Sequence, residues 1–177
     1  SRGMSDADIL LASHRALHEV LAEEWAGRDA GLPYRSPYEA LIMASLVEKE
    51  TGVAEERQEI AGVFVRRLQK GMLLQTDPAV IYGLGESFDG NLTREHLRAP
   101  GPYNTYLNAG LPPSPIALPG RAAIHAALHP APGSALYFVA RGDGSHEFSA
   151  SLEEHNRAVR KYQLQRRGTA YRSRPQG

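Results

Sequence analysis

Hydrophobic positions are densest in residues 41–47, an almost unbroken apolar segment that is followed by two carboxylates, Glu48 and Glu50. On a helix of about 100° per residue these carboxylates point about 200° apart, so one pocket can hardly receive both. Apolar residues occupy most of the helical circle, which predicts a helix buried on several sides. Glu50 falls between Met43 and Leu46 on this circle. A carboxyl group there would have a raised pKa, as a general acid requires.

The start of this helix is marked by Ser36, Pro37 and Glu39, a capping-box pattern with proline at the first helical position. Its end is expected near Thr51 and Gly52. Periodic apolar residues and capping residues predict further helices. They are expected from Ser5 to about Ala26, from Ala54 to Gln69 with Gly71 as the stop, after a cap at Thr76 or Asp77, after a cap at Thr93, from Gly120 to Leu128 before Pro130, and from a capping box at Ser151 and Glu154 to about Gln165.

A β-hairpin is predicted near the end of the chain, with strands at 135–140 and 146–149 joined by a turn at 141–145. Residues 83–118 are dense in Gly, Pro and Asn, and an irregular segment of this length is more often functional than a mere connection. The fold class expected is α+β: a helix-rich single domain with a small antiparallel β-hairpin and a long Gly/Pro-rich loop region that lines a cleft.

We expect residues 1–165 to form this domain and residues 166–177, which are basic and lack an apolar period, to be a disordered tail. Residues 1–4 have the look of a cloning remnant. A length of 177 residues favours one domain with one core.

Composition excludes several classes of protein. Lys plus Arg equals Asp plus Glu at 20 each, so nothing favours a nucleic-acid partner or an anionic membrane. Cysteine is absent, which excludes disulfides, thiolate metal sites and a cysteine nucleophile. No membrane-spanning segment and no signal-peptide pattern is present in the sequence.

Two histidine pairs, His14 with His18 and His125 with His129, have the i, i+4 spacing of zinc ligands. Neither pair has a third ligand at motif spacing, and the chain has no HExxH sequence. We therefore expect neither a metal nor another cofactor, and a zinc enzyme is the weakest alternative.

Other polar residues allow two interpretations each. Asp77 is accounted for as a helix cap, although a catalytic role stays open. The sequence Tyr-Asn-Thr-Tyr at 103–106 offers flat apolar faces and hydrogen-bonding groups suited to a sugar, but two tyrosines that anchor a loop are equally expected. His146 lies where the hairpin re-enters the sheet, and a histidine there is more often structural than catalytic.

Five motifs in order resemble the MltG (YceG-like) endolytic murein transglycosylases from about Trp25 to Tyr162. They are Met-Ala-Ser-Leu-Val-Glu-Lys-Glu-Thr at 43–51, Gly-Met-Leu-Leu-Gln-Thr-Asp-Pro at 71–78, Tyr-Asn-Thr-Tyr at 103–106, Gly-Leu-Pro-Pro at 110–113 and Leu-Tyr-Phe-Val at 136–139. Family members usually begin with a membrane anchor and a small LysM-like domain, so the resemblance implies that this chain is a C-terminal catalytic part.

The resemblance implies that Glu50, the second glutamate of the Glu-Lys-Glu motif, is the catalytic acid and base. It also implies that a further group of residues shapes the substrate cleft. This group comprises Gln75, Thr76, Asp77, Tyr103, Asn104, Thr105, Tyr106 and His146. Three positions depart from the family pattern: Arg66 replaces a common Asn, Ser114 a usual Gly, and Leu118 a frequent Asn.

The activity that the resemblance implies is non-hydrolytic cleavage between N-acetylmuramic acid and N-acetylglucosamine within peptidoglycan glycan strands, leaving 1,6-anhydro ends. It further implies a location at the periplasmic face of the inner membrane and coupling to peptidoglycan synthases. Two alternatives remain, namely a glycan hydrolase that uses Glu50 with Asp77, and a glycan-binding module without catalytic activity.

Overall fold

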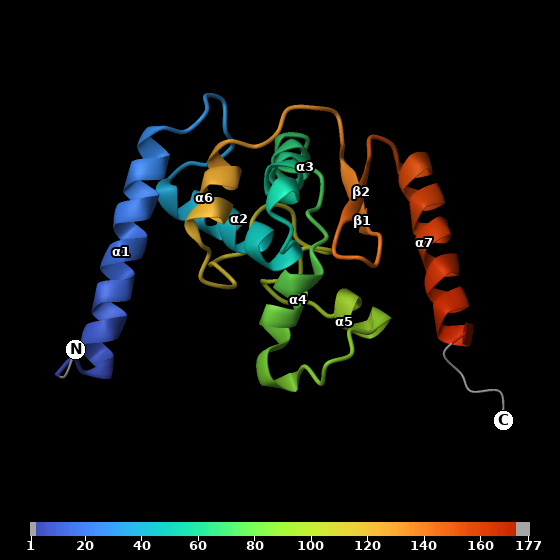
Figure 1. The fold of residues 1–177 in the computed structure, drawn as a ribbon, viewed down its shortest axis with the longest axis horizontal. Coiled ribbons are helices and arrows are strands. Elements are labelled where there is room, and N and C mark those ends of the chain that lie inside the picture. Colours follow the sequence, from blue (N-terminus) through green and yellow to red (C-terminus); the bar gives the residue numbers. More distant parts are fainter. Residues whose placement is uncertain (1–2, 173–177) are drawn as a thin grey trace.

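The structure is a computed structural model that describes residues 3–172, of which residues 166–172 are described in backbone conformation alone. It is helix-rich with one two-stranded antiparallel sheet, so the predicted α+β class is confirmed. Figure 1 shows the elements in order along the chain. They are α1 (Asp6–Ala26), α2 (Pro37–Glu50), the 3₁₀ turn η1 (Ala54–Glu56), α3 (Arg57–Gln69), α4 (Asp77–Leu84), the 3₁₀ turn η2 (Gly85–Ser87), α5 (Arg94–Arg98), α6 (Arg121–Leu128), β1 (Tyr137–Ala140), β2 (His146–Ser149) and α7 (Leu152–Arg172).

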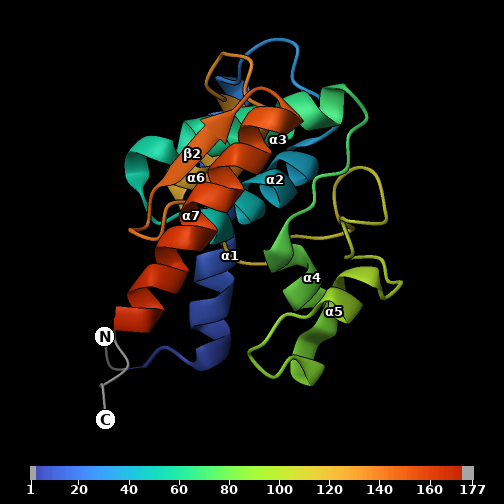
Figure 2. The same cartoon turned by 90° about the vertical axis from the view of Figure 1, so that its right-hand side faces the viewer.

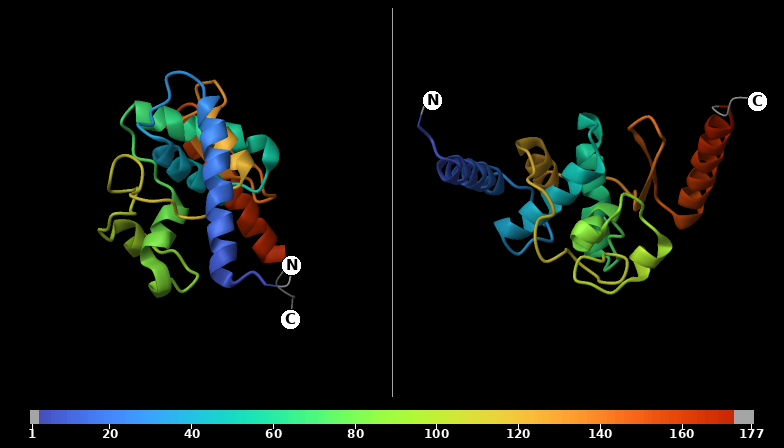
Figure 3. Two further views of the ribbon diagram at one scale, coloured as in Figure 1. Left: turned by 90° about the vertical axis from the view of Figure 1, so that its left-hand side faces the viewer. Right: turned by 90° about the horizontal axis from the view of Figure 1, so that it is seen from below.

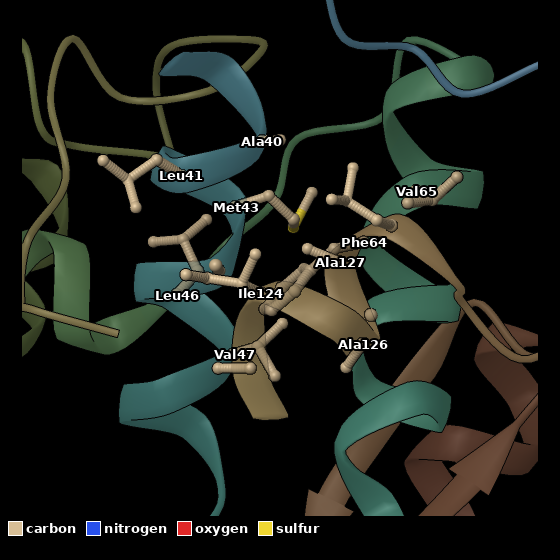
Figure 4. Close-up of a cluster of buried hydrophobic side chains, with 14 of the residues drawn as sticks. Ala40, Leu41, Met43, Leu46, Val47, Phe64, Val65, Ile124, Ala126 and Ala127 are labelled. Carbon is tan, nitrogen blue, oxygen red and sulfur yellow. The ribbon is translucent and has the colours of Figure 1, made fainter. Parts of the chain in front are cut away.

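Helix α2 is the centre of the core, because its residues 40–47 are all buried. It packs against α3 and α6, and Figure 4 shows Met43 and Leu46 of α2 facing Phe64 of α3 and Ile124 of α6. Each large apolar side chain buried in this way stabilises the fold by about 1.5–3 kcal/mol. The prediction of a helix buried on several sides is therefore confirmed.

The N-terminal ends of α2 and α7 are capped by the predicted residues, but one hydrogen bond of each capping box differs from the prediction. Ser36 Oγ accepts a hydrogen bond from the backbone N–H of Glu39, as expected, but the Glu39 carboxylate accepts from the N–H of Arg35 rather than from that of Ser36. The same holds for α7: Ser151 Oγ accepts from the N–H of Glu154, and the Glu154 carboxylate accepts from the N–H of Ala150 rather than from that of Ser151. In both cases the glutamate satisfies a donor one residue earlier, so the start of the helix is fixed by the same two side chains.

Helix α3 ends at a left-handed glycine, as predicted. Gly71 has a φ of 69°, the N–H of Met72 donates to the carbonyl of Arg67 at 2.8 Å, and the N–H of Gly71 donates to that of Leu68 at 3.2 Å. This is a Schellman motif, which needs a residue that tolerates positive φ. Four residues after this turn lies Gln75, a non-glycine residue that also has a positive φ, of 50°.

The hairpin forms where the sequence predicts it, with Tyr137 opposite Ser149 and Ala140 opposite His146. It packs against α3 through an edge-to-face contact between Phe64 and Phe138, whose ring centroids are 5.6 Å apart. Helix α7 covers the outer side of the hairpin (Figure 2).

Helix α7 continues to Arg172, past the end expected near Gln165. Residues 166–172 of the predicted tail are thus helical, and residues 173–177 lie outside the described residues. The sequence from 166 to 172 has no proline to interrupt the helix. Backbone hydrogen bonds can extend a helix that has already formed even where it has no apolar face, so the lack of apolar periodicity after Gln165 does not end α7.

Helix α1 stands apart from the body over its N-terminal half (Figures 1 and 3). Leu21 is its only buried residue, whereas Ile9, Leu10 and Leu11 are exposed. Only the C-terminal half packs on the core, through Leu21 together with the partly buried Trp25 and its neighbours. Within residues 3–172, no helix is long and apolar enough to cross a membrane.

Candidate active site

Glu50 is the last residue of α2, so the central helix carries this carboxylate directly from the core to the surface of the domain. Its Oε1 atom accepts a hydrogen bond from the Thr76 hydroxyl at 2.7 Å. Thr76 is fully buried and holds the N-cap position of α4, but its side chain makes no capping bond, because the hydroxyl is committed to Glu50. The predicted cap is therefore a cap by backbone position alone.

Burial raises the pKa of the Glu50 carboxyl to about 7. The hydrogen bond from Thr76 opposes this shift in pKa, the negative charge of Asp77 adds to it, and the charge of His146 also opposes it. At neutral pH the carboxyl group is therefore poised between its protonated and ionised forms, as a group that must both give and take a proton requires.

A cleft of about 470 Å³ opens beside Glu50, within the size range of small-ligand sites. It is bounded by α3, by the segment before α4, by the hairpin and by α7. Five predicted site residues line it: Glu50, Gln75, Asp77, Tyr106 and His146. The remaining lining residues are Arg67, Leu74, Phe138, Val139, Ala140 and His155.

Asp77 and Tyr106 form a pair in this cleft, because the Tyr106 hydroxyl donates a hydrogen bond to Asp77 Oδ1. Burial raises the pKa of Tyr106 well above its usual value, and the bond to Asp77 raises it further, so the phenol stays a neutral donor. Asp77 lies in the first turn of α4, where the helix dipole favours a carboxylate. The pair places one acceptor and one rigid aromatic side chain next to Glu50.

His146 is buried, and both its backbone N–H and its Nδ1 atom bond to the carboxylate of Glu56, at 2.9 and 2.8 Å. These two bonds fix the orientation of the imidazole ring and leave its Nε2 atom as the remaining polar atom of the ring. Sequence reasoning missed Glu56, because a glutamate near the start of a helix is sufficiently explained by the helix dipole.

Thr105 and Asn104 do not line the cleft; they hold the loop behind it. Thr105 Oγ1 accepts a hydrogen bond from the N–H of Thr76, and the carbonyl of Thr105 accepts one from Gln75. The Asn104 amide is consumed by backbone groups, since it donates to the carbonyls of Leu97 and Ala99 and accepts from Tyr106. Asn104 and Thr105 therefore position the neighbouring residues.

Tyr103 also lies outside the cleft that contains Glu50. Its hydroxyl bonds to Ser114 Oγ at 2.6 Å, and its ring packs edge-on against Tyr82, with ring centroids 4.9 Å apart. A Cβ atom on Gly83 would approach the Tyr103 side chain to 2.9 Å, so this close packing needs glycine. Of the two readings of the Tyr-Asn-Thr-Tyr segment, loop anchoring describes Tyr103 and substrate contact remains available to Tyr106.

Arg67 and His155 also line the cleft and were not predicted. Arg67 is buried and donates to the carbonyls of Leu73 and Leu136, at 2.7 and 2.6 Å. His155 stacks on Tyr137, and its Nδ1 atom is buried with no partner among the described residues. Burial, followed by the charge of Arg67, lowers the pKa of His155.

A signal for Arg67 was present in the sequence. Arg67 lies three positions after Phe64 and seven after Ile60, on the apolar side of α3, where a charged residue is unusual.

Glu48 is on the opposite side of α2, as the helical positions predict. Its Oε1 atom accepts a hydrogen bond from the N–H of Gly120 at 2.9 Å, immediately before α6. Glu48 thus joins α2 to α6, and only Glu50 reaches the cleft.

The three departures from the family pattern are accommodated outside the cleft. Arg66 donates to the carbonyls of Ala131 and Ala135, Ser114 bonds to Tyr103, and Leu118 is 73% exposed.

These observations define a helix-rich domain with a polar cleft, in which one partly buried carboxyl group at the end of the central helix has a raised pKa. A sequence profile of the YceG-like family matches residues 1–161. The chain belongs to the YceG-like family, as the motifs predicted.

Relatives and a solved structure agree with this assignment. The chain is 46% identical over 127 residues to an endolytic murein transglycosylase of Bacillus subtilis (strain 168), which covers 72% of this chain and 35% of the relative. It is 37% identical over 126 residues to the protein of that name from Streptococcus pneumoniae (strain R6), a match that covers 68% of this chain and 23% of the relative. A 2.6 Å crystal structure of a YceG-like protein from Listeria monocytogenes matches with a TM-score of 0.67 at 40% identity, covering 85% of this chain and 45% of that chain. The chain thus spans 35% or less of the length of these two named transglycosylases.

Proposed function

We propose that this domain is a lytic transglycosylase that cleaves the N-acetylmuramic acid to N-acetylglucosamine bond within peptidoglycan strands and leaves 1,6-anhydro ends. The name of the relatives, endolytic murein transglycosylase, supports the substrate and the reaction class. The observation that carries the proposal is the carboxyl group of Glu50, which has a pKa of about 7 and faces a cleft. One group that both gives and takes a proton at neutral pH is what this reaction needs.

In the first step, protonated Glu50 donates its proton to the glycosidic oxygen, and the bond from this oxygen to the anomeric carbon breaks. Positive charge then develops on the muramoyl ring, as in other glycosidic cleavages. After it gives up this proton, Glu50 is a carboxylate, and the Thr76 hydroxyl donates a hydrogen bond to it. A hydrogen bond to the charged form stabilises it, so Thr76 favours the state that the second step uses.

In the second step, the Glu50 carboxylate takes the proton from the 6-hydroxyl of the same muramoyl residue, whose oxygen bonds to the anomeric carbon. Glu50 is thereby returned to its protonated form, and the atoms balance without a water molecule. Because the nucleophile is part of the substrate, its effective concentration is high and no second carboxylate is required to activate it.

The other cleft residues have supporting roles in this proposal. Asp77 raises the pKa of Glu50 by its charge and accepts the hydroxyl proton of Tyr106, while His146 presents an imidazole that is fixed by Glu56. Arg67 adds a guanidinium charge to the cleft wall, suited to carbonyl and carboxylate oxygens of the substrate, and His155 beside it adds a neutral imidazole.

A glycan hydrolase is the second candidate, because Asp77 also lines the cleft and its charge acts on Glu50. In that reaction Asp77 would serve as the second carboxylate. The mass of the products separates the two reactions, since a hydrolase adds one water molecule to the new end whereas a transglycosylase adds none.

The location and the partners of the protein are proposed from the family resemblance alone. We place it at the periplasmic face of the inner membrane, with glycan strands as substrate and peptidoglycan synthases as partners.

Digestion of purified glycan strands by the chain, followed by mass spectrometry of the products, tests the proposed function. Anhydro ends that disappear in Glu50→Gln are expected. Products with added water would favour the hydrolase, and intact strands that bind the chain would favour a binding module. Loss of cleavage in Glu48→Gln with full cleavage in Glu50→Gln would overturn the assignment of Glu50.

A further inference from the structure

The C-terminal end of α1 and the C-terminal end of α6 bring together a second group of titratable side chains, none of which lines the cleft. One carboxylate oxygen of Glu24 and one ring nitrogen each of His125 and His129 all lie within 4.8 Å of one another. About 100 residues separate the carboxylate from the histidines along the chain. The sequence therefore showed only the histidine pair, and the third ligand comes from the packing of α1 on α6.

We propose that Glu24, His125 and His129 bind one divalent transition-metal ion of the Zn²⁺ class and that the ion fastens α1 to α6. Two imidazoles and a carboxylate suit Zn²⁺ and its neighbours in the first transition row, whereas Mg²⁺ and Ca²⁺ prefer oxygen ligands alone. The site is separate from the proposed reaction, and its function is structural.

The three ligand atoms are close to the spacing that such an ion requires. Ligand atoms at about 2.0–2.2 Å from a tetrahedral Zn²⁺ lie about 3.3–3.6 Å from one another. His125 Nδ1 and Glu24 Oε2 are already 2.9 Å apart, and the rings of His125 and His129 are stacked with centroids 4.3 Å apart. The side chain of His125 is 50% exposed, so it can turn to close the remaining distance.

Asp29 gives the site a supporting carboxylate. Its Oδ1 atom lies 2.8 Å from His129 Nδ1, which leaves His129 Nε2 for the ion. A carboxylate behind a metal-bound imidazole fixes the orientation of the ring and makes the nitrogen more basic. The backbone N–H of Asp29 donates to the carbonyl of Leu128 at 3.0 Å, so this carboxylate is fixed to the end of α6.

The local charge also favours a cation. Glu23, Glu24 and Asp29 are negative, and among the side chains that the structure describes the guanidinium of Arg121 is the one that contacts them, at 3.0 Å from Glu23 Oε2 and 3.3 Å from Glu24 Oε1. Arg121 occupies the other oxygen of Glu24 and leaves Oε2 beside His125. Carboxylates outnumber the guanidinium, so an added cation reduces repulsion.

The site would matter because α1 has few other anchors. Leu21 is its one buried residue, and the N-terminal half stands clear of the body (Figure 1). An ion held between Glu24 and α6 would fix the direction in which that half projects.

The chain contains its own control. His14 and His18 are also i, i+4 histidines with stacked rings, whose centroids are 5.9 Å apart, but both are exposed, and the described part of the chain groups no carboxylate from another element with them. If Zn²⁺ binds weakly to any i, i+4 histidine pair, substitution of either pair should reduce binding equally. If Zn²⁺ binds the proposed site, substitution of His125 and His129 alone should remove it.

Zinc titration of the purified chain by calorimetry, and cobalt titration by visible absorption, test the proposal. The expected result is one Zn²⁺ per chain that persists in the double variant His14→Gln, His18→Gln and is lost in His125→Gln, His129→Gln. The variant Asp29→Asn should weaken binding roughly 10–100-fold. Millimolar Mg²⁺ should not compete, and hydrogen exchange of the α1 amides at residues 20–26 should slow when Zn²⁺ is added.

Three results would overturn the proposal: no saturable binding at millimolar Zn²⁺, equal loss from both histidine pairs, or binding that leaves hydrogen exchange in α1 unchanged. Circular dichroism of the apo variants checks that each is folded. Glycan cleavage by the chain without metal is expected to be normal, so failure here is distinguishable from failure of the proposed transglycosylase activity.

Discussion

The Thr76 hydroxyl donates a hydrogen bond to Glu50 Oε1 at 2.7 Å, across 26 residues of sequence. This bond joins the C-terminal end of α2 to the N-terminal end of α4, and it stabilises the ionised form of a carboxyl group whose pKa burial raises to about 7. Burial is the largest contribution to the pKa of Glu50 and the Thr76 hydroxyl is the next, ahead of the charges of Asp77 and His146, and the hydroxyl can be removed by mutation.

The variant Glu50→Gln is expected to lower the rate of glycan cleavage by roughly 10²–10⁴-fold, because an amide cannot donate and accept the proton. The rate of product formation, followed by mass spectrometry under single-turnover conditions, measures the effect. Glu48→Gln is the matched control, since Gln keeps an oxygen that accepts from Gly120. A rate in Glu50→Gln close to that of the unmodified chain would contradict the proposed chemistry.

Replacing Thr76 by Val should move the pH profile. The hydrogen bond from Thr76 lowers the pKa of Glu50, so its removal raises this pKa further above about 7. Cleavage needs Glu50 protonated at the start, so the alkaline limb of kcat/KM, expected near pH 7, should shift to higher pH. Thr76→Ser keeps the hydroxyl and should keep the limb in place. An unchanged limb in Thr76→Val would show that the bond does not control Glu50.

Folding stability should fall as the pH rises from about 4.5 to about 7. In this range the unfolded chain releases the Glu50 proton first, because the folded pKa is raised to about 7 from an ordinary 4.5. The raised pKa therefore favours the folded state fully below pH 4.5, and this contribution disappears once the pH passes 7. The contribution is up to about 3 kcal/mol.

Glu50→Gln should remove this dependence, because the amide does not titrate. Relative to the unmodified chain, its free energy of unfolding in urea should be higher at pH 8 by up to about 3 kcal/mol, and the difference should shrink toward pH 4. Glu48→Gln should show no such gain. A constant difference across this range would argue against a raised pKa in the folded chain.

Much of the fold follows from local patterns, and the contacts of the site do not. The start of α2 at Pro37, the stop at Gly71 and the hairpin at 141–145 are set by residues close in sequence, so periodicity and caps predicted them. The helical positions placed Glu50 among apolar residues, and the family resemblance is what selected it as the catalytic carboxylate. Thr76 was read as a cap, since nothing local shows that its hydroxyl meets a residue 26 positions away.

The residues that were misplaced or missed make contacts that form only in the folded chain. Asn104 has the chemistry of a sugar ligand, but its amide is used by loop carbonyls that only the folded chain brings near. Glu56 fits an ordinary helix in the sequence, whereas Arg67 stands out only as a charged residue on the apolar side of its helix. Their roles arise from the hairpin, which is about 70–90 residues further along and lies against α3.

Glu56→Ala should destabilise the domain by about 1–3 kcal/mol, because the buried N–H and Nδ1 of His146 would lose their acceptor. Glu55→Ala, at the exposed neighbouring position of η1, is the matched control and should change stability by no more than about 0.5 kcal/mol. Urea unfolding measures both. Because the His146 ring would also turn, cleavage at temperatures where the variant stays folded should slow in Glu56→Ala and recover in part in Glu56→Gln, which restores one acceptor. Equal stability of the two alanine variants would mean that Glu56 does not hold His146 in solution.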